Sequence, residues 1–243
     1  MAEVEIERHE GWAEVVLNRP ERKNAINGPL GVALERAITN ATAEPACGAI
    51  LFRGAEGAFC SGLDLKAFNE EPAPEWLEQF QTIWRGAHRA LFDCPVPIVC
   101  AMERFAINGG AALALAADLL VAGEGGFLQV GEIQQGMAAP YNVAWLNLRA
   151  PETVRARLIF TGRRFSGREL QEMGLAHECV SDEDVLATAR SLCEQLGSFP
   201  EGGSRRIKAG LRAHVQASAD AWFDAAVAAD PIQKRLSPGF QRG

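Results

Sequence analysis

Two glycine-containing stretches of the chain offer backbone N–H groups that could bind a negatively charged oxygen. The first is GAEGAFCSGLDLKAF (54–68), and the second is INGGAALALA (107–116). The N–H groups at the start of a helix carry a partial positive charge, and glycine lets a ligand approach the backbone. Taken singly, close helix packing explains the second stretch about equally well, and a plain strand-to-helix loop explains the first better. Neither stretch has the glycine–lysine pattern of a P-loop, and Ser61 lacks the GxSxG context of a hydrolase.

Together, the two stretches indicate a more specific chemistry. Two converging N–H groups form an oxyanion hole, which stabilises negative charge on a carbonyl oxygen. Glu132 follows on a segment with Gly131 and the apolar residues Val130 and Ile133. A carboxylate in apolar surroundings has a raised pKa and can exchange protons near neutral pH. The alternative for Glu132 is a solvated loop acid, the usual fate of a lone glutamate.

The elements that would position these residues alternate between strands and helices. Residues 4–18 predict a β-hairpin around Glu10-Gly11, and apolar runs predict strands at 48–54, 95–102, 118–123 and 176–180. Helical spacing predicts helices at 29–42 and 74–94, a helix within 107–117, and further helices at 140–148, 151–161, 167–173 and 184–196. This alternation predicts an α/β fold with largely parallel strands. After residue 180 the pattern is helical, and we therefore divide the chain into a core (1–180) and a helical C-terminal region (181–243).

Composition narrows the class of protein. The 243 residues are 48% apolar and 23% charged, which is typical of a globular domain. The net charge of −7 argues against nucleic acid as a partner. Six cysteines without CxxC pairs and four scattered histidines argue against a metal site. The acidic N-terminus lacks the apolar core of a signal peptide, and the uncharged stretch 105–117 is too short to span a bilayer. We expect a cytoplasmic protein with reduced thiols and no membrane partner.

Four segments, in this order, resemble the crotonase superfamily, the enoyl-CoA hydratase/isomerase family. They are LNRPERKNAIN (17–27), GAFCSGLDLK (57–66), the stretch 95–127 that begins PVPIVCAM, and FTGRRFSGRELQEMGLAHECV (160–180). The resemblance implies a crotonase-like spiral of ββα units with a helical C-terminal trimerisation region. It also implies a homotrimer or a hexamer of two trimers, an acyl-CoA thioester substrate, and no cofactor beyond the coenzyme A of that substrate.

Carried over position by position, the resemblance assigns roles to individual residues. The oxyanion donors are the N–H groups of Leu63 and Gly109, and Glu132 is the acid/base. The coenzyme A contacts fall on two short runs and one glycine, namely Asn24, Ala25 and Ile26, Asp64, Leu65 and Lys66, and Gly110. Candidates for the phosphates are Arg22, Lys23, Lys66 and Lys234, and for each one singly a solvated surface charge is at least as good an interpretation.

The departures from the family pattern favour one reaction. Ala112 occupies the position of the first of two glutamates that hydratases of this family use, whereas Glu132 retains the second. Asn108 replaces a glycine before the oxyanion donor, and Gly131 replaces a proline before Glu132. Hydration divides its proton transfers between two carboxylates. A single carboxylate suits a proton shuttle, and we therefore expect isomerisation of 3-enoyl-CoA to 2-enoyl-CoA.

Other reactions remain open from the sequence. A hydratase whose second acid has moved, or a decarboxylase or thioester hydrolase, would use the same oxyanion hole. Tyr141 and Asn142 fall where such a pocket residue would act, although Tyr141 suits a packed aromatic residue equally well. A non-catalytic acyl-CoA binder is the alternative from a different class, and the retained Glu132 argues mildly against it.

Overall fold

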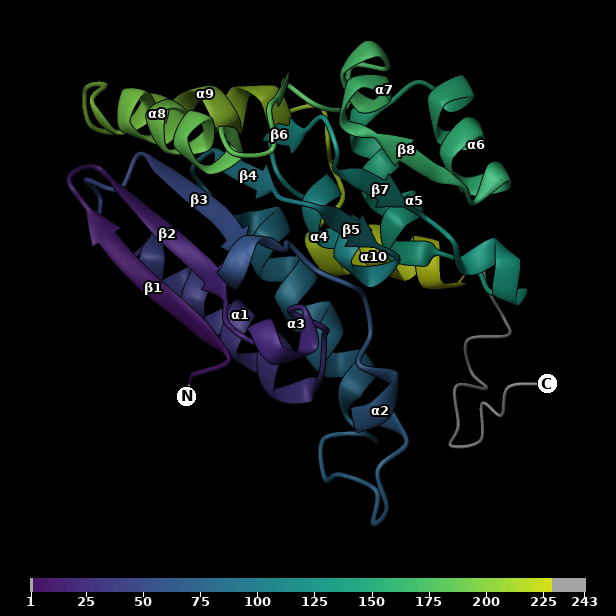
Figure 1. Cartoon of the computed structure of the whole chain (residues 1–243). Helices are drawn as coiled ribbons and strands as arrows, with labels where there is room; N and C mark the ends of the chain where they lie inside the picture. Colours follow the sequence, from purple (N-terminus) through teal and green to yellow (C-terminus); the bar gives the residue numbers. More distant parts are fainter. Residues whose placement is uncertain (1, 229–243) are drawn as a thin grey trace.

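The computed structural model describes residues 2–228, and its centre is a six-stranded sheet (Figure 1). The strand order is β1-β2-β3-β4-β6-β9, in which only the β1–β2 pair is antiparallel. The strands are β1 (Val4–His9), β2 (Trp12–Leu17), β3 (Ala49–Gly54), β4 (Ile98–Met102), β6 (Leu119–Gly123) and β9 (Glu178–Val180). The predicted hairpin, the four further strands and the largely parallel α/β fold are therefore confirmed. Lys234 and the rest of 229–243 lie outside the described residues.

The inner strands β2, β3, β4 and β6 are buried on both faces, which explains why they are mostly apolar. Along β3, Ile50 and Phe52 face one cluster of buried side chains, whereas Leu51 faces a second cluster on the other side. Helix α1 (Gly28–Ala41) covers the first face, and helix α8 (Val185–Gly197) covers the second (Figure 1). Alternate side chains thus fill two separate cores across one sheet.

A second, three-stranded sheet has the order β5-β7-β8, with β5 (Phe105–Ile107), β7 (Phe127–Gln129) and β8 (Arg164–Ser166). The chain runs from β4 through β5 into helix α4 (Gly109–Leu115), and then from β6 through β7 towards helix α5 (Pro140–Arg149). Each of these turns consists of one strand in each sheet followed by a helix. This is the spiral of ββα units that the resemblance to the crotonase superfamily implied.

Two sequence predictions need correction. The helix predicted at 74–94 is helix α3 (Phe80–Asp93), because residues 75–79 form turns that precede it. The three strands of the second sheet were not predicted. The remaining helices are α2 (Leu65–Phe68), α6 (Glu152–Thr161), α7 (Gly167–Glu172), α9 (Gly203–Arg212) and α10 (Ala219–Ala228).

The C-terminal helices pack onto the preceding chain. Val185, Ala189 and Cys193 of α8 fill the second core against the central sheet. The α9 residue Lys208 binds Asp118 with an Nζ–Oδ2 distance of 2.7 Å, and Phe223 of α10 is buried against α3 and α5. The residues after 180 thus share the core of the first region, and their role in oligomerisation stays a prediction. Within residues 2–228, no helix combines the length and the apolar character needed to cross a membrane.

Candidate active site

The two glycine-containing loops lie side by side. The Cys60 N–H donates to the Phe105 carbonyl at 3.2 Å, and the Ile107 N–H donates to the Cys60 carbonyl at 3.1 Å. These bonds join the first loop to β5, the strand that leads into α4. A Cβ atom at Gly109 would consequently lie only 3.9 Å from Leu63 Cδ2. The structure therefore brings the two predicted oxyanion donors together.

The N–H groups of Leu63 and Gly109 lie outside the backbone pairing of the two loops. Gly109 is the first residue of α4, where an N–H has no acceptor inside the helix. On either side of Leu63, the Ile26 N–H donates to the Gly62 carbonyl and the Asp64 N–H donates to the Ile26 carbonyl, both at 2.8 Å. Because Gly62 and Asp64 make these bonds to Ile26, the N–H of Leu63 between them points away from Ile26. Within residues 2–228, neither N–H has a backbone acceptor.

The glycines of these loops are required by the contact between them. Gly62 has φ of +92°, and a Cβ there would lie 2.8 Å from the Ile107 carbonyl oxygen. A Cβ at Gly110 would lie 2.5 Å from the Cys60 carbonyl oxygen. Both distances are too short for any other residue without a shift of the backbone. The bare backbone at Gly110 thus has a packing reason, and its role in ligand binding stays a prediction.

Glu132 is a buried carboxylate with one occupied and one free oxygen. It opens a short 3₁₀-helix (Glu132–Gln135), and 9% of its surface is exposed. Oε1 accepts a hydrogen bond from Asn142 Nδ2 at 3.0 Å, whereas buried Oε2 has no partner among the described residues. Burial raises the pKa of the Glu132 carboxyl to about 7, against the opposing effect of hydrogen bonds from its own backbone and from Asn142. The alternative of a solvated loop acid is therefore excluded.

Asn142 connects Glu132 to the oxyanion loop. Its amide nitrogen also donates to the Asn108 carbonyl at 3.1 Å, one residue before Gly109. In turn, the Asn108 side-chain Oδ1 accepts from the Gly131 N–H at 2.8 Å. The sequence placed Asn142 only as one possible pocket residue. The available signal was an asparagine inside the first turn of the helix that begins at Pro140, because asparagine is unfavourable within helices unless its side chain has another partner.

A cluster of aromatic side chains lies next to the oxyanion loop, and we call it the aromatic wall. It consists of Trp84, His88, Tyr141, Trp145 and Phe223. The Trp145 Nε1–H donates to His88 Nδ1 at 2.9 Å, and the His88 ring stacks on Tyr141 with 4.4 Å between centroids. Burial lowers the pKa of His88 to about 3, so this imidazole is neutral at physiological pH. Because a Cβ at Gly109 would lie 3.7 Å from Trp84 Cζ2, the aromatic wall borders the oxyanion loop.

The residues predicted to contact coenzyme A fall into one neighbourhood. The bridge between Ile26 and Leu63 places the run 24–26 beside the run 64–66. Asn24 uses its side chain internally, donating to the Ala58 carbonyl at 2.7 Å and accepting from the Arg19 N–H at 2.9 Å. Ala25 and Ile26 are buried, whereas Leu65 and Lys66 are exposed. Only the latter two therefore present side chains to solvent.

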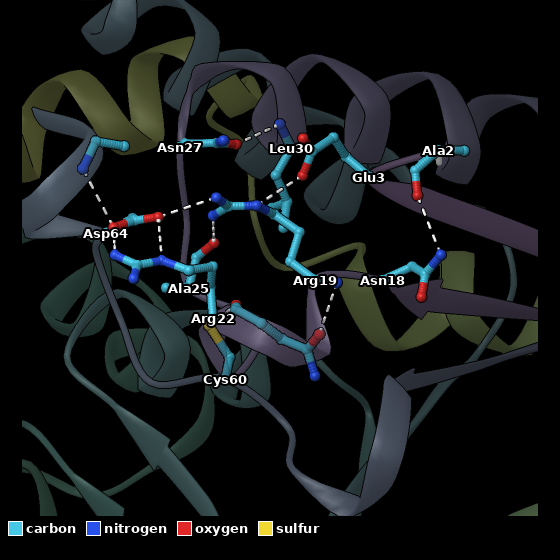
Figure 2. A network of polar contacts seen from close by, with 12 residues as sticks. Ala2, Glu3, Asn18, Arg19, Arg22, Ala25, Asn27, Leu30, Cys60 and Asp64 are labelled. Carbon is cyan, nitrogen blue, oxygen red and sulfur yellow. Dashed lines mark hydrogen bonds and ion pairs between the residues drawn. The ribbon is translucent and has the colours of Figure 1, made fainter. Parts of the chain in front are cut away.

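Asp64, the remaining member of the second run, is occupied by two arginines (Figure 2). Arg19 Nη2 lies 2.9 Å from its Oδ2, and Arg22 Nη2 lies 2.6 Å from its Oδ1. Asp64 also caps helix α2 by accepting from the Ala67 N–H. Burial alone would raise the pKa of Asp64, but the hydrogen bonds from Arg22, Ala67 and Arg19 outweigh it and hold this pKa well below its usual range. Arg22, a candidate for the phosphates, is already paired here.

Other reactive side chains do not join this site. Cys60 is buried with its Sγ directed to the Asn24 carbonyl at 3.1 Å, and burial raises the pKa of its thiol to about 12. Such a thiol is inert at neutral pH. Among the described residues, Glu7, His9 and Glu14 are close enough together to ligate a metal, but both Arg53 and Arg190 already bind the Glu14 carboxylate.

Comparison with known proteins agrees with this architecture. The family model described as enoyl-CoA hydratase/isomerase matches residues 7–232. A 1,2-epoxyphenylacetyl-CoA isomerase of Escherichia coli is 28% identical over 218 residues, covering 88% of this chain and 83% of the relative. A carnitinyl-CoA dehydratase of Proteus mirabilis is 30% identical over 187 residues, covering 76% of this chain and 70% of the relative. The crystal structure of an enoyl-CoA hydratase/isomerase from Mycobacterium paratuberculosis superposes with a TM-score of 0.83 at 25% identity, covering 95% of this chain and 92% of that one.

Proposed function

The chain belongs to the enoyl-CoA hydratase/isomerase family, and we propose that it isomerises 3-enoyl-CoA thioesters to 2-enoyl-CoA thioesters. In this proposal, the substrate thioester oxygen accepts hydrogen bonds from the N–H groups of Leu63 and Gly109. Glu132 then acts on the two carbon atoms between which the proton moves.

The reaction needs one group that first accepts and then returns a proton. Glu132 Oε2 takes the proton from C2, and the negative charge spreads over a dienolate whose oxygen lies in the oxyanion hole. The same carboxyl group then delivers the proton to C4, which leaves the double bond between C2 and C3. The Glu132 pKa of about 7 suits both steps, because neither the acid nor the carboxylate is strongly favoured at neutral pH.

The observation that carries the proposal is the buried Glu132 carboxylate, one oxygen of which has no partner among the described residues. Asn142 occupies Oε1, which leaves Oε2 as the oxygen able to reach a substrate. At the position of the first glutamate of hydratases, Ala112 is fully buried and offers no acid. A shuttle between two carbons of one substrate requires only the group that is present.

Hydration is the second candidate, and one observation favours it. Asn142 Oδ1 and Glu132 Oε2 are both buried acceptors without a partner among the described residues. A water molecule that donated to both would satisfy them, and Glu132 could then deprotonate it. The carnitinyl-CoA dehydratase among the relatives carries out chemistry of this class by name.

Absorbance and mass measured together distinguish the two reactions. Purified protein is mixed with a medium-chain 3-enoyl-CoA, with Glu132→Gln alongside. Conjugation absorbance at unchanged mass, lost in Glu132→Gln, supports the isomerase. The matching 2-enoyl-CoA is tested in parallel, because water adds only to the conjugated double bond, and a product of it that is heavier by one water indicates a hydratase. Binding of both thioesters without any product would contradict both reactions and favour a different acyl-CoA reaction or a binding protein.

We further propose that coenzyme A lies along the neighbouring runs 24–26 and 64–66, and that the protein forms a homotrimer or a hexamer. Two apolar side chains of α9 that are four residues apart, Ile207 and Leu211, are 67% and 69% exposed, which supports a contact with another subunit. Analytical ultracentrifugation tests the assembly, and a monomeric mass at micromolar concentration would contradict it.

A further inference from the structure

We propose that Asn108 is a positioning residue that couples the Gly109 oxyanion donor to the Glu132 carboxylate, and that it does so only in combination with Gly131. The inference rests on the proposed roles of Gly109 and Glu132. It goes beyond them because it identifies what holds these two groups in register with each other.

The backbone of Asn108 sets the direction of the oxyanion donor. Asn108 has φ of 51° and ψ of −112°, a combination that residues other than glycine rarely adopt. The Gly109 N–H belongs to the peptide unit that this ψ angle orients. Backbone hydrogen bonds fix this conformation on both sides. The Asn108 N–H donates to the Gln129 carbonyl at 2.8 Å, and the Asn108 carbonyl accepts from the Ala112 N–H at 3.0 Å.

The same residue is tied to Glu132 by two routes. Its Oδ1 accepts from the Gly131 N–H at 2.8 Å, which fixes the backbone immediately before Glu132. Its carbonyl accepts from Asn142 Nδ2 at 3.1 Å, and that same nitrogen holds Glu132 Oε1 at 3.0 Å. Asn108 thus holds both the main chain just before Glu132 and, through Asn142, the Glu132 carboxylate itself.

The bond between Asn108 and Gly131 has requirements on both sides. It needs a side-chain acceptor at 108 and an N–H at 131. Space at 131 is also tight, because a Cβ there would lie 3.2 Å from Asn108 Oδ1. These are the two positions at which the chain departs from the glycine and proline of the family pattern. With asparagine at 108 and glycine at 131, the acceptor and the N–H donor are both present. With glycine at 108 and proline at 131, both are absent, so no group is left without a partner. Either mixed pair leaves one group without its counterpart.

Stability and catalysis should therefore respond differently to Asn108→Gly. Glycine adopts the positive φ of this position without strain, so the substitution removes a backbone penalty. It also removes the acceptor of the Gly131 N–H and frees the segment before Glu132. A purely structural role would lower stability and activity together, whereas a positioning role lowers kcat in a protein that is at least as stable.

The test is a double-mutant cycle of Asn108→Gly, Gly131→Pro and the combined variant. Arg104→Gly is the matched control, because Arg104 also has a positive φ of 58° and precedes β5, but its side chain is exposed. For each protein, kcat and KM are measured on 3-enoyl-CoA, together with the melting temperature. The dissociation constant of acetoacetyl-CoA is measured as well, because its enolate offers a negatively charged oxygen to the proposed oxyanion hole without requiring isomerisation.

We expect each single variant to lose about tenfold in kcat, the effect of one lost hydrogen bond, with KM changed less than about twofold. The combined variant should return to within about threefold of the wild-type kcat, because the two losses are not independent. Asn108→Gly should not lower the melting temperature, and Arg104→Gly should leave kcat unchanged. If Gly131→Pro does not fold, Asn108→Gly against Arg104→Gly decides the matter alone.

Losses that multiply to about a hundredfold in the combined variant would overturn the proposal. So would an Asn108→Gly protein with full kcat, or one in which kcat and melting temperature fall together. If the wild type does not isomerise 3-enoyl-CoA, the cycle is evaluated on acetoacetyl-CoA affinity. Coupled losses there would uphold the role of Asn108 while the proposed reaction fails, and independent losses would overturn the role of Asn108.

Discussion

Asp64 and Glu132 are both buried carboxylates, yet their surroundings are opposite. Two guanidinium groups and a backbone N–H bind Asp64. A single amide binds Glu132, and its second oxygen has no partner among the described residues. The pKa of Asp64 is held well below its usual range, whereas that of Glu132 is raised to about 7.

The difference shows that burial alone does not determine the behaviour of an acid. Burial raises the pKa of both carboxyl groups, and the number of positive partners decides the net direction. Asp64 is a permanent anion that ties the run 19–25 to helix α2. No cation among residues 2–228 binds Glu132, and its raised pKa lets it exchange a proton near neutral pH. The same contrast separates a structural carboxylate from a reactive one in an otherwise similar position.

The strongest test of this contrast is the loss of activity in Glu132→Gln. Glutamine keeps the shape and an acceptor for Asn142 but cannot accept the substrate proton. We expect kcat/KM on 3-enoyl-CoA to fall about 10³-fold, within the range for a general acid–base group. Glu172→Gln, on the exposed end of α7, is the control and should retain full activity. Appreciable turnover in Glu132→Gln would place the proton transfer elsewhere.

Asp64→Asn should instead reduce stability. The substitution leaves Arg19 without its buried counter-charge, and breaking such a pair costs about 3 kcal/mol. Denaturant unfolding measures this loss at pH 7. Because the pKa of Asp64 is depressed in the folded protein, its stabilisation is present above the ordinary aspartate pKa and disappears as the pH falls below it. Asp220→Asn, which breaks an exposed ion pair with Arg89, is the control and should cost under about 1 kcal/mol.

The pH dependence of stability at Glu132 should have the opposite sign. Its folded pKa of about 7 exceeds the ordinary value of 4.5, so the folded state binds the proton more tightly. The contribution of Glu132 to stability is therefore present below about pH 4.5 and is lost as the pH rises through 7. Relative to the wild type, Glu132→Gln should gain up to about 3 kcal/mol between pH 4.5 and 8. An unchanged difference across this range would mean that Glu132 has an ordinary pKa.

The smallest expected effect is that of Asn142→Leu. The amide of Asn142 favours the charged form of Glu132, and its removal should raise the pKa of that carboxyl further. The ascending limb of kcat/KM against pH should move to higher pH, and kcat/KM at pH 7 should fall about tenfold. Asn147→Leu makes the same change at an exposed position of α5 and should leave the profile in place. A lower rate with an unmoved profile would assign Asn142 to packing alone.

The sequence was sufficient to predict the parts of the fold that have a local signature. Strands β3 and β4 are continuous apolar runs, and the hairpin of β1 and β2 has a glycine turn at Gly11. The strands β5, β7 and β8 have only three residues each, too few to establish a period of two. Residues 75–79 keep the apolar spacing of α3 but form turns, and Trp76 packs there against Phe68 of α2.

The site residues likewise divide into those with a local sequence signature and those that depend on contacts between distant segments. The glycine loops and Glu132 could be predicted because they stand in recognisable local sequence. The bond between Asn108 and Gly131 joins residues 23 apart, and the bond between Asn142 and Glu132 joins residues ten apart in different elements. The two arginines that bind Asp64 precede it by more than forty residues. Contacts of this kind depend on how the spiral stacks its turns, which no local pattern contains.

The packing of α10 has a consequence for how the protein is made. Phe223 inserts between His88, Tyr141 and Trp145, so the aromatic wall is closed by a helix that the ribosome delivers long after Glu132. A nascent chain halted before residue 219 would leave that wall open to water and to other chains. The surroundings of His88, Tyr141 and Trp145 are therefore complete only after translation has passed helix α10.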